Sequence, residues 1–232
     1  MIKRVFIDLD NTIIKDEEED MKCYRGVLES LGFNPDDYEA VYNSIDGYET
    51  SLTEENPYYN MKDMIDYINS TLNKSYPYEL ADRLNDVIAV EWAKKERVLL
   101  PEDVVQYLSS KYDLYIFTNY AQKVQEKRIE NIGYREYFRE LFGADVYGAK
   151  PFRSSFERAI RHMYGADADI DRAIREIIYI GDSKKTDINF ARNIGIKSIL
   201  FDEDGSRSAA SFDLGDYEYV VIHNWREIMD IL

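Results

Sequence analysis

The sequence has few of the residues that build disulfide frameworks and soft-metal sites. Its 232 residues include one cysteine, Cys23, and two histidines, His162 and His223. One cysteine excludes an intrachain disulfide and a thiolate metal cage, and the two histidines have no metal-ligand spacing. A protein without disulfides is typical of a reducing compartment. We therefore expect a cytoplasmic protein whose site uses neither Cys23 nor the histidines.

Basic residues are also too few to balance the acidic ones. The chain contains 29 Lys and Arg residues and 45 Asp and Glu residues, which gives a formal net charge of -16 and an isoelectric point near 4.6. This charge repels nucleic-acid phosphates and anionic lipid surfaces. We expect no nucleic-acid partner. A phosphate bound by such a protein must be screened locally by a metal ion, a lysine or backbone N–H groups.

Long apolar runs are absent as well. The first run, residues 5–7, is broken at once by Asp8 and is too short for the apolar part of a signal peptide. No later stretch is long enough to span a bilayer. We expect no membrane partner, and the oligomeric state is left open.

The residues that are present indicate a folded α/β protein. Hydrophobic residues make up 45% of the chain and charged residues 32%, which is typical of globular domains. Short apolar runs that end in polar residues predict parallel strands at residues 5–9, 114–117, 177–180, 197–201 and 219–222. Amphipathic patterns predict helices at residues 102–112, 122–132, 154–164 and 186–194.

The alternation of strands and helices predicts a doubly wound, Rossmann-like parallel sheet with helices on both faces. Ligands of such sheets bind outside the carboxyl ends of the strands. The polar residues that follow the predicted strands should therefore lie in one site.

Residues 15–97 interrupt the alternation. They contain no convincing strand, and apolar residues recur at helical spacing, for example at Leu80, Leu84, Val87 and Ile88. We predict an inserted α-helical subdomain over residues 15–97 and an α/β core made of residues 1–14 and 98–232.

Four helices are predicted in this insertion, at residues 17–31, 36–43, 58–72 and 78–92, with breaks at Gly47 and residues 55–57. The acidic run 16–20 is interpreted as the solvated first turn of a helix, with a metal or substrate role as the alternative. The insertion is also rich in tyrosine, at Tyr42, Tyr48, Tyr58, Tyr59 and Tyr67. Packing in an amphipathic core is the favoured interpretation, and stacking on a substrate base or sugar is the alternative.

Carboxylates follow the first predicted strand, at Asp8 and Asp10. Alone, this pair is compatible with a charged turn. Three further segments with polar residues stand at corresponding places along the chain: Thr118-Asn119, Lys150-Pro151, and Gly181-Asp182 with Asp187. The agreement of four segments favours a site over a turn.

These segments resemble the four motifs of the haloacid dehalogenase-like hydrolase superfamily, in the same order along essentially the whole chain. The motifs are matched in turn by Asp8-Leu9-Asp10-Asn11-Thr12, by Thr118 followed by Asn119, by Lys150, and by Gly181, Asp182 and Asp187. The resemblance implies a phosphatase with a helical cap inserted between the first and second motifs, which is where residues 15–97 lie.

The resemblance also implies a role for each residue. Asp8 would be the nucleophile that forms an aspartyl-phosphate. Asp10 would protonate the leaving oxygen and then activate the water that opens this intermediate. Thr118 and the backbone N–H of Asn119 would hold phosphate oxygens, and Lys150 would offset their charge. The expected substrate is a small phosphomonoester.

Several carboxylates at one sheet edge raise one another's pKa and repel an anionic substrate unless a cation lies among them. Magnesium prefers oxygen ligands. The predicted ligands are the side chains of Asp8 and Asp182, the backbone carbonyl of Asp10, and Asp187 either directly or through water. Helix capping is the alternative role for Asp187, and a surface lysine is the alternative for Lys150.

Other functions use similar residues. A dehalogenase shares the aspartate nucleophile but needs neither the second acid nor a metal, so Asp10, Asp182 and Asp187 disfavour it. A phosphomutase differs mainly in how well its cap shields the phospho-enzyme from water. A receiver module is disfavoured by the Asp8 to Asp10 spacing and the long insertion, and a catalytically silent phosphate-binding or scaffold protein by the intact acid pair. Sugar phosphates, phosphoglycolate and nucleoside monophosphates are all compatible substrates.

Overall fold

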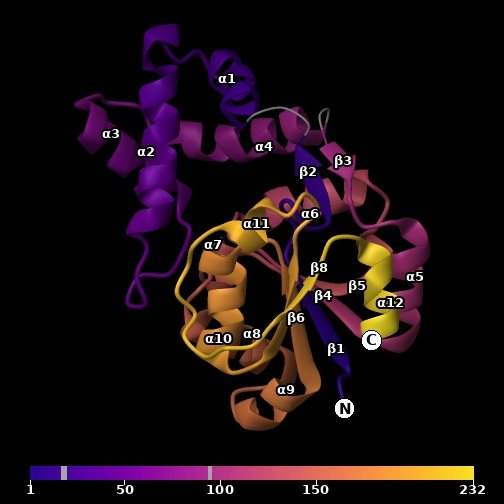
Figure 1. The fold of residues 1–232 in the computed structure, drawn as a ribbon. Helices are drawn as coiled ribbons and strands as arrows, with labels where there is room; N and C mark the ends of the chain where they lie inside the picture. Colours follow the sequence, from indigo (N-terminus) through magenta and orange to yellow (C-terminus); the bar gives the residue numbers. More distant parts are fainter. Residues whose placement is uncertain (17–19, 94–95) are drawn as a thin grey trace.

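The chain forms a six-stranded sheet with helices on both faces (Figure 1). This computed structural model describes residues 1–16, 20–93 and 96–232. The strand order is β5-β4-β1-β6-β7-β8, and every neighbouring pair is parallel. The strands are β1 (Arg4–Ile7), β4 (Asp113–Phe117), β5 (Phe138–Phe142), β6 (Ile177–Gly181), β7 (Lys197–Phe201) and β8 (Val220–Ile222). The predicted doubly wound α/β fold is confirmed.

Both faces of β1 are buried because its apolar residues are consecutive. Successive side chains of a strand point to opposite faces, so Val5 and Ile7 pack in one apolar cluster and Phe6 in another. The first cluster is covered by α5 (Glu102–Lys111) and α12 (Ile228–Ile231), and the second by α8 (Arg153–Tyr164), α9 (Ile170–Glu176) and α10 (Asn189–Ile194). A strand that is apolar at every position is typical of a parallel sheet with two covered faces.

The order of the strands reverses at β1. This strand pairs with β4 on one side and β6 on the other. The chain builds β4 and β5 outward in one direction and β6, β7 and β8 in the other. Such a switch point opens a crevice at the carboxyl ends of the strands. Asp8, Thr118 and Asp182 directly follow β1, β4 and β6, so all three are brought to it.

Between β1 and α5 the chain forms a layer of helices joined to the core through two short strands. β2 (Ile14–Asp16) pairs with β3 (Glu96–Val98) in antiparallel fashion. The helices, named here the inserted helices, are α1 (Asp20–Ser30), α2 (Tyr38–Ser51), α3 (Met61–Leu72) and α4 (Glu79–Ala93). They pack around an apolar cluster that includes Val41, Ile65 and Leu84 and extends to core residues such as Tyr120 and Val124. Figure 1 shows them above the sheet, with β2 and β3 between the two layers.

The insertion differs from the sequence-based expectation in two respects. β2 and β3 extend into residues 15–97, where the sequence predicts no strand. Helix α2 also continues through Gly47, which is predicted as a break. A Cβ atom at Gly47 would lie 2.9 Å from the Tyr67 hydroxyl oxygen of α3. The residue is therefore small because two helices pack closely there, and tertiary packing overrides the low helix propensity of glycine.

Other predictions for the insertion can be compared with the structure. Leu80 and Leu84 are buried and Val87 packs partly buried against them, as predicted. Residues 17–19, which include most of the acidic run and the predicted start of the first helix, lie outside the described residues, as does the side chain of Ile88. Among the tyrosines, Tyr48 and Tyr59 are buried and Tyr42 and Tyr67 pack partly buried, while Tyr58 is more exposed. The packing interpretation holds for the first four.

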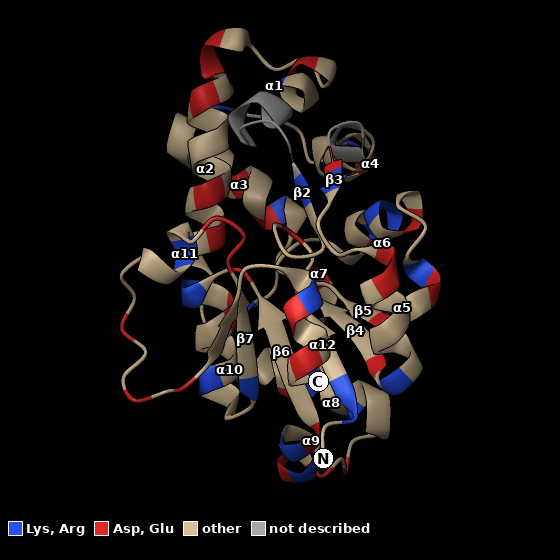
Figure 2. Cartoon of the chain, turned by 45° about the vertical axis from the view of Figure 1, so that its right-hand side comes forward, with Lys and Arg blue, Asp and Glu red and all other residues tan. Residues whose placement is uncertain are grey.

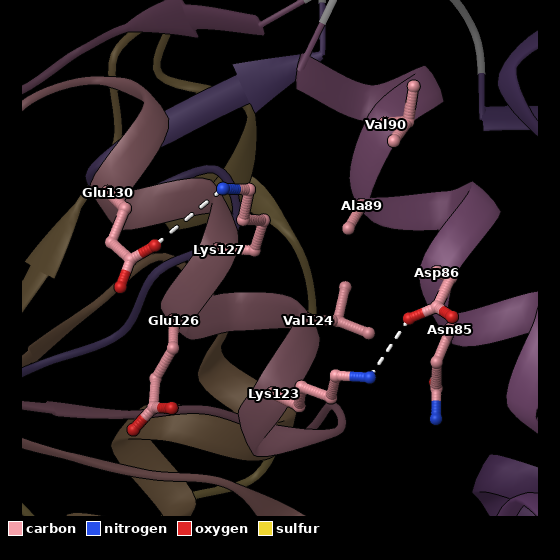
Figure 3. Close-up of a pocket in the computed structure, with 9 residues that line it drawn as sticks. All are labelled: Asn85, Asp86, Ala89, Val90, Lys123, Val124, Glu126, Lys127 and Glu130. Atoms are coloured by element: carbon pink, nitrogen blue, oxygen red, sulfur yellow. Dashed lines mark hydrogen bonds and ion pairs between the residues drawn. The ribbon is translucent and has the colours of Figure 1, made fainter.

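Within the described residues, the insertion contacts the core through the loop between α2 and α3 and through α4. In the loop between α2 and α3, the carbonyl of Pro57 accepts a hydrogen bond from the Ala149 N–H at 2.7 Å. The second contact is between α4 and α6 (Gln122–Asn131), where Lys123 forms an ion pair with Asp86 at 3.0 Å. Figure 3 shows this ion pair across the groove between α4 and α6. The first contact lies directly beside Lys150.

Charged side chains are spread over the whole molecule. Figure 2 shows acidic residues on the inserted helices and on the helices and loops of the core alike. Among the described residues, no helix combines the length and apolar character needed to cross a membrane.

Candidate active site

Lys150 brings two of the predicted carboxylates together at the switch point. Its buried ammonium donates hydrogen bonds to Oδ1 of Asp8 at 2.5 Å and to Oδ1 of Asp187 at 2.6 Å. Burial lowers the pKa of the Lys150 ammonium, but Asp187 and Asp8 outweigh this effect and raise it above its usual value. Lys150 is therefore a buried, permanently charged group between two carboxylates. The interpretation of Lys150 as a surface lysine is wrong.

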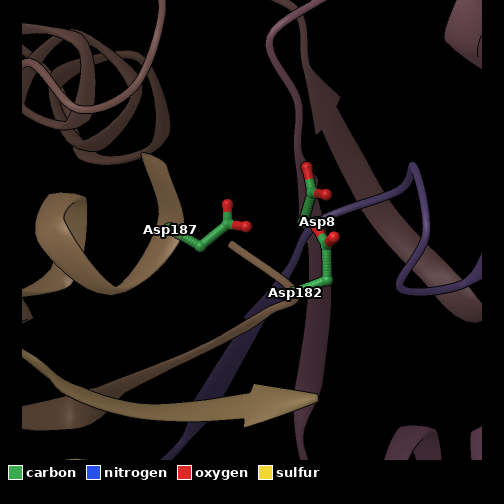
Figure 4. Close-up of side chains that lie close together, drawn as sticks. All are labelled: Asp8, Asp182 and Asp187. Carbon is green, nitrogen blue, oxygen red and sulfur yellow. The ribbon is translucent and has the colours of Figure 1, made fainter. Parts of the chain in front are cut away.

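Three predicted metal ligands converge in the same place. Carboxylate oxygens of Asp8, Asp182 and Asp187 lie within 4.8 Å of one another, and all three residues are buried (Figure 4). Burial raises the pKa of Asp8 well above its usual range; Lys150 lowers it, while Asp187 and Asp182 raise it further. Burial, together with the charge of Asp187, raises the pKa of Asp182 to about 7. The group thus holds more negative charge than its surroundings stabilise, and its hard oxygen donors fit a magnesium ion.

Asp187 reaches this group from a π-helical turn, Lys184–Ile188. Its Oδ2 accepts a hydrogen bond from the Ser183 N–H at 2.9 Å, while its Oδ1 accepts from Lys150. Ser183 is the N-cap of this turn, so Asp187 bonds back to the cap residue with one oxygen and joins the carboxylate group with the other. A Cβ atom at Gly181 would lie 2.3 Å from Cγ of Asp187. Glycine at position 181 is thus required by the close approach of Asp187.

Two buried groups position Lys150. Asn119 bonds to its backbone through both atoms of the side-chain amide. The Tyr179 hydroxyl lies 3.0 Å from the Lys150 Nζ and 3.1 Å from both the Phe117 carbonyl oxygen and Asp187 Oδ1. Burial and the charge of Asp187 raise the pKa of Tyr179 well above its usual value, so the hydroxyl stays protonated. Asn119 thus fixes the backbone of Lys150, and Tyr179 contacts the ammonium at the end of its side chain.

Asp10 is bound differently from the other acids. Its side chain is 41% exposed and is held by α6. Gln125 Nε2 donates to Oδ2 of Asp10 at 2.6 Å, and Arg128 Nη1 donates to Oδ1. The structure therefore does not place the Asp10 side chain in the carboxylate group. This arrangement is compatible with the predicted use of its backbone carbonyl alone as a metal ligand.

Thr118 is fully buried after β4. Its backbone N–H donates to the Phe142 carbonyl at 3.1 Å, and Gln125 Nε2 donates to its hydroxyl oxygen at 2.8 Å. Because the hydroxyl oxygen accepts from Gln125, its hydrogen is left to donate elsewhere. The hydroxyl can therefore act as a donor to an anion.

Four residues of the site are missed by the sequence analysis: Gln125, Arg128, Tyr179 and Arg207. Gln125 and Arg128 share the buried face of α6 with apolar residues, a polar pair in an apolar stripe that could have been noticed. Tyr179 lies in an otherwise aliphatic strand, and its buried hydroxyl requires a partner. Arg207 of α11 (Ser206–Ala209) forms an ion pair with Asp182, and no pattern in the sequence indicates it.

The histidines lie outside the site, as expected. His162 pairs with Glu140 at 2.8 Å, and His223 Nδ1 lies 2.6 Å from the carbonyl oxygen of Asp202.

Comparisons with known proteins give the family and the fold. The profile of the family described as haloacid dehalogenase-like hydrolase matches residues 5–201. YfnB of Bacillus subtilis (strain 168), which is named as a HAD-hydrolase, is 23% identical over 206 residues, covering 87% of this chain and 85% of YfnB. The crystal structure of YfnB bound to magnesium superposes with a TM-score of 0.69 and 17% identity, covering 99% of this chain and 98% of that chain.

Two further solved structures show the range of activities on this fold. A HAD phosphatase from Thermococcus onnurineus has a TM-score of 0.63 and 18% identity, covering 99% of this chain and 97% of its own. A 2-haloacid dehalogenase from Pseudomonas syringae pv. tomato DC3000 has a TM-score of 0.65 and 19% identity, covering 100% and 98%. At these identities the likeness shows a shared fold. The family profile extends over most of the chain and includes all four motifs, and this protein is a member of the haloacid dehalogenase-like hydrolases.

Proposed function

We propose that the protein is a magnesium-dependent phosphatase that hydrolyses a small phosphomonoester through a phosphorylated Asp8. The observation that carries this proposal is the buried group of Asp8, Asp182 and Asp187 around the Lys150 ammonium, with Asp10 two residues after Asp8. The group supplies a nucleophile and a cation site, and Asp10 supplies a separate carboxylate for proton transfer.

In the first step, the Asp8 carboxylate attacks phosphorus and the bond between phosphorus and the ester oxygen breaks. Asp10 gives a proton to the departing oxygen. Lys150 offsets the negative charge of the transferring phosphoryl group. The Thr118 hydroxyl hydrogen and the backbone N–H of Asn119 are the proposed donors to its remaining oxygens.

In the second step, water attacks the phosphorus of phosphorylated Asp8. Asp10, now ionised, takes a proton from this water, and the bond between Asp8 and phosphorus breaks. Inorganic phosphate leaves, Asp8 returns to its carboxylate form, and Asp10 is again protonated. Both steps therefore need Asp10 close to the reacting phosphorus.

The residues proposed to hold magnesium are Asp8, Asp182, the backbone carbonyl of Asp10, and Asp187 directly or through water. When bound, magnesium supplies positive charge that neutralises the carboxylates and the phosphoryl oxygens. The raised pKa values of Asp8 and Asp182 support a need for such charge.

The inserted helices are proposed to act as a cap. The proposed division is a cap over residues 15–97 and a core of residues 1–14 and 98–232, joined by β2 and β3. The hydrogen bond between Pro57 and Ala149 supports it, because it places the loop between α2 and α3 beside Lys150. Closure over the site would exclude water during the first step.

A dehalogenase is the closest rival because it also uses an aspartate nucleophile. Cleavage of a carbon–halogen bond by Asp8 would leave a halide ion, which needs no proton from Asp10, and it would have no use for a cation among Asp8, Asp182 and Asp187. The presence of both features favours phosphoester hydrolysis.

The test is a phosphate-release screen with magnesium over p-nitrophenyl phosphate, sugar phosphates, phosphoglycolate and nucleoside monophosphates, beside halide release from 2-haloacids. We expect phosphate release that stops on chelation and in Asp8→Asn. Halide release without phosphate release would contradict the proposal. Interconversion of phosphate isomers with little phosphate release would identify a phosphomutase instead.

A further inference from the structure

We infer that Arg128 is a positioning residue for Asp10, and that Glu96 of β3 holds Arg128 in place. The acid/base carboxylate is thereby bound to the strand that joins the inserted helices to the core. The inference rests on the proposed function, in which Asp10 transfers protons.

Helix α6 presents two polar side chains to Asp10. Gln125 and Arg128 are three residues apart, so they lie on the same face of the helix. Gln125 is fully buried and Arg128 is 1% exposed. Arg128 Nη1 donates to the side-chain oxygen Oε1 of Gln125 at 2.7 Å, which turns the Nε2 of Gln125 toward Asp10 and Thr118. Both oxygens of the Asp10 carboxylate therefore accept hydrogen bonds from α6.

Glu96 fixes the direction of the Arg128 side chain. Arg128 Nε donates to Oε1 of Glu96, whose side chain is 2% exposed. A guanidinium is a planar fork, so a partner at Nε determines where the Nη atoms point. Here Nη1 points at Asp10. A change in the position of Glu96 is thus passed through one rigid group to the Asp10 carboxylate.

Glu96 belongs to a strand that both layers of the molecule share. It is paired with Asp16 of β2 in the antiparallel β2–β3 pair, through which the chain passes to and from the inserted helices. Movement of the inserted helices relative to the sheet must therefore pass through β2 and β3. Asp10, Arg128 and Glu96 form one connected chain from the candidate site to this crossing.

The cost of this arrangement argues against a purely structural role. Taking Arg128 and Glu96 out of water is expensive, and apolar residues of similar volume often stabilise a protein as well or better. The charges lie instead against the partly exposed carboxylate of Asp10, for which Gln125 would otherwise be the described side-chain partner. A proton donor must be held within hydrogen-bond reach of the leaving oxygen, and this arrangement holds Asp10 in one orientation.

The test compares two substrates that differ in their need for a proton donor. An alkyl phosphate expels a strongly basic oxygen and depends on Asp10, whereas p-nitrophenyl phosphate expels a stable phenolate and depends on it much less. We expect Arg128→Lys to lower kcat/KM roughly 10²-fold for the alkyl phosphate, with a much smaller loss for p-nitrophenyl phosphate. Glu96→Gln, which keeps the shape and an acceptor, should change the ratio of the two kcat/KM values in the same direction by less.

Controls separate positioning from general damage. Arg97 is next to Glu96 on β3 and forms an exposed ion pair with Glu203 at 3.0 Å. Arg97→Gln removes this ion pair and should leave the ratio of the two kcat/KM values unchanged. Thermal unfolding shows whether each variant is folded. In an Asp10→Asn background, Arg128→Lys should give no further change in the ratio, because its effect acts through Asp10.

The outcomes are distinguishable. If the wild-type protein releases phosphate from no ester, the proposed function fails and the inference fails with it. If the wild-type protein is active but Glu96→Gln and folded Arg128→Lys leave the ratio at the wild-type value, the inference alone is overturned. A further change in the Asp10→Asn background would also overturn it.

Discussion

Asn119 and Lys150 exchange two hydrogen bonds. Oδ1 of Asn119 accepts from the Lys150 backbone N–H at 2.6 Å, and its Nδ2 donates to the Lys150 carbonyl oxygen at 3.1 Å. Asn119 follows β4 and Lys150 follows α7 (Ala144–Tyr147), the short helix after β5, so one side chain joins the segments that follow two neighbouring strands. The backbone of Lys150 is fixed on both sides, and this fixes the origin of the ammonium that bonds to Asp8.

Asn119→Ala removes both bonds and should loosen Lys150. Because Lys150 is buried, the backbone groups left unpaired should cost about 1–3 kcal/mol in the free energy of unfolding. We also expect a lower kcat/KM for p-nitrophenyl phosphate. Urea unfolding and steady-state kinetics measure the two effects. Asn193→Ala is the matched control, since Asn193 is exposed and bonds only to the neighbouring Pro151 carbonyl at 2.9 Å among the contacts described. Equal effects of the two variants would contradict the role of Asn119.

Tyr179→Phe tests the second support of Lys150. The variant keeps the ring and removes the hydroxyl that contacts Lys150, Asp187 and the Phe117 carbonyl oxygen. We expect a folded protein that loses about 1–2 kcal/mol of unfolding free energy and has a lower kcat. Tyr115→Phe, on β4, which β1 separates from β6, and outside the carboxylate group, serves as control. Wild-type kcat in Tyr179→Phe would show that the hydroxyl does not position Lys150.

Magnesium should stabilise the protein, and more so at high pH. The pKa of Asp182 is raised from 3.8 to about 7 in the metal-free fold. Between these values the folded state binds more protons at Asp182 than the unfolded state does, so the contribution of Asp182 to the stability of the metal-free protein falls as pH rises and levels off above about pH 7. Magnesium must displace the proton, so its stabilising effect should grow over the same range.

Thermal unfolding with magnesium and with a chelator, at about pH 6 and about pH 8, measures this difference. Asp182→Asn should weaken the dependence of Tm on pH in the presence of the chelator. It should also remove most of the rise in Tm that magnesium causes. The same gain in Tm at both pH values in the wild-type protein would mean that magnesium does not bind at Asp182.

Gly181→Ala should damage the carboxylate group directly. The new Cβ atom would lie 2.3 Å from Cγ of Asp187, so Asp187 must move away from Lys150. We expect overpacking to lower the free energy of unfolding by about 1–3 kcal/mol. We also expect the variant to lose the magnesium-dependent rise in Tm. Gly133→Ala is a useful comparison, because it strains a left-handed residue with nothing within 4 Å and should leave the magnesium effect intact. A normal magnesium effect in Gly181→Ala would contradict the role of Asp187.

The sequence predicts the fold best where burial alone decides the structure. The central strands β1, β4, β6 and β7 are short apolar runs, and each is present. The edge strand β5 is missed because Arg139 and Glu140 interrupt its apolar pattern, and an edge strand need not be buried along its length. The strands β2 and β3 have three residues each, too short for a periodic signal, and form because the chain crosses there twice.

The site divides in the same way. Asp8 and Asp182 are found because they directly follow predicted strands that converge on one edge, and Lys150 and Asp187 because their order along the chain matches known motifs. Their supports are not found, because a charged or amide side chain on a helix usually faces water. Arg128 is buried where Glu96 and Asp10, which are far from it in the sequence, approach it in the fold. Such pairings depend on tertiary structure, which no local pattern contains.

The most direct test of the account is to trap the phosphoryl group on the protein. The Asp10→Asn variant is mixed with p-nitrophenyl phosphate and magnesium, quenched with acid, and digested with trypsin, which releases residues 5–15 as one peptide. We predict a peptide heavier by one phosphoryl group, and borohydride reduction that converts residue 8 into homoserine. An active wild-type protein together with an unmodified peptide, or homoserine at any other position, would contradict Asp8 as the nucleophile.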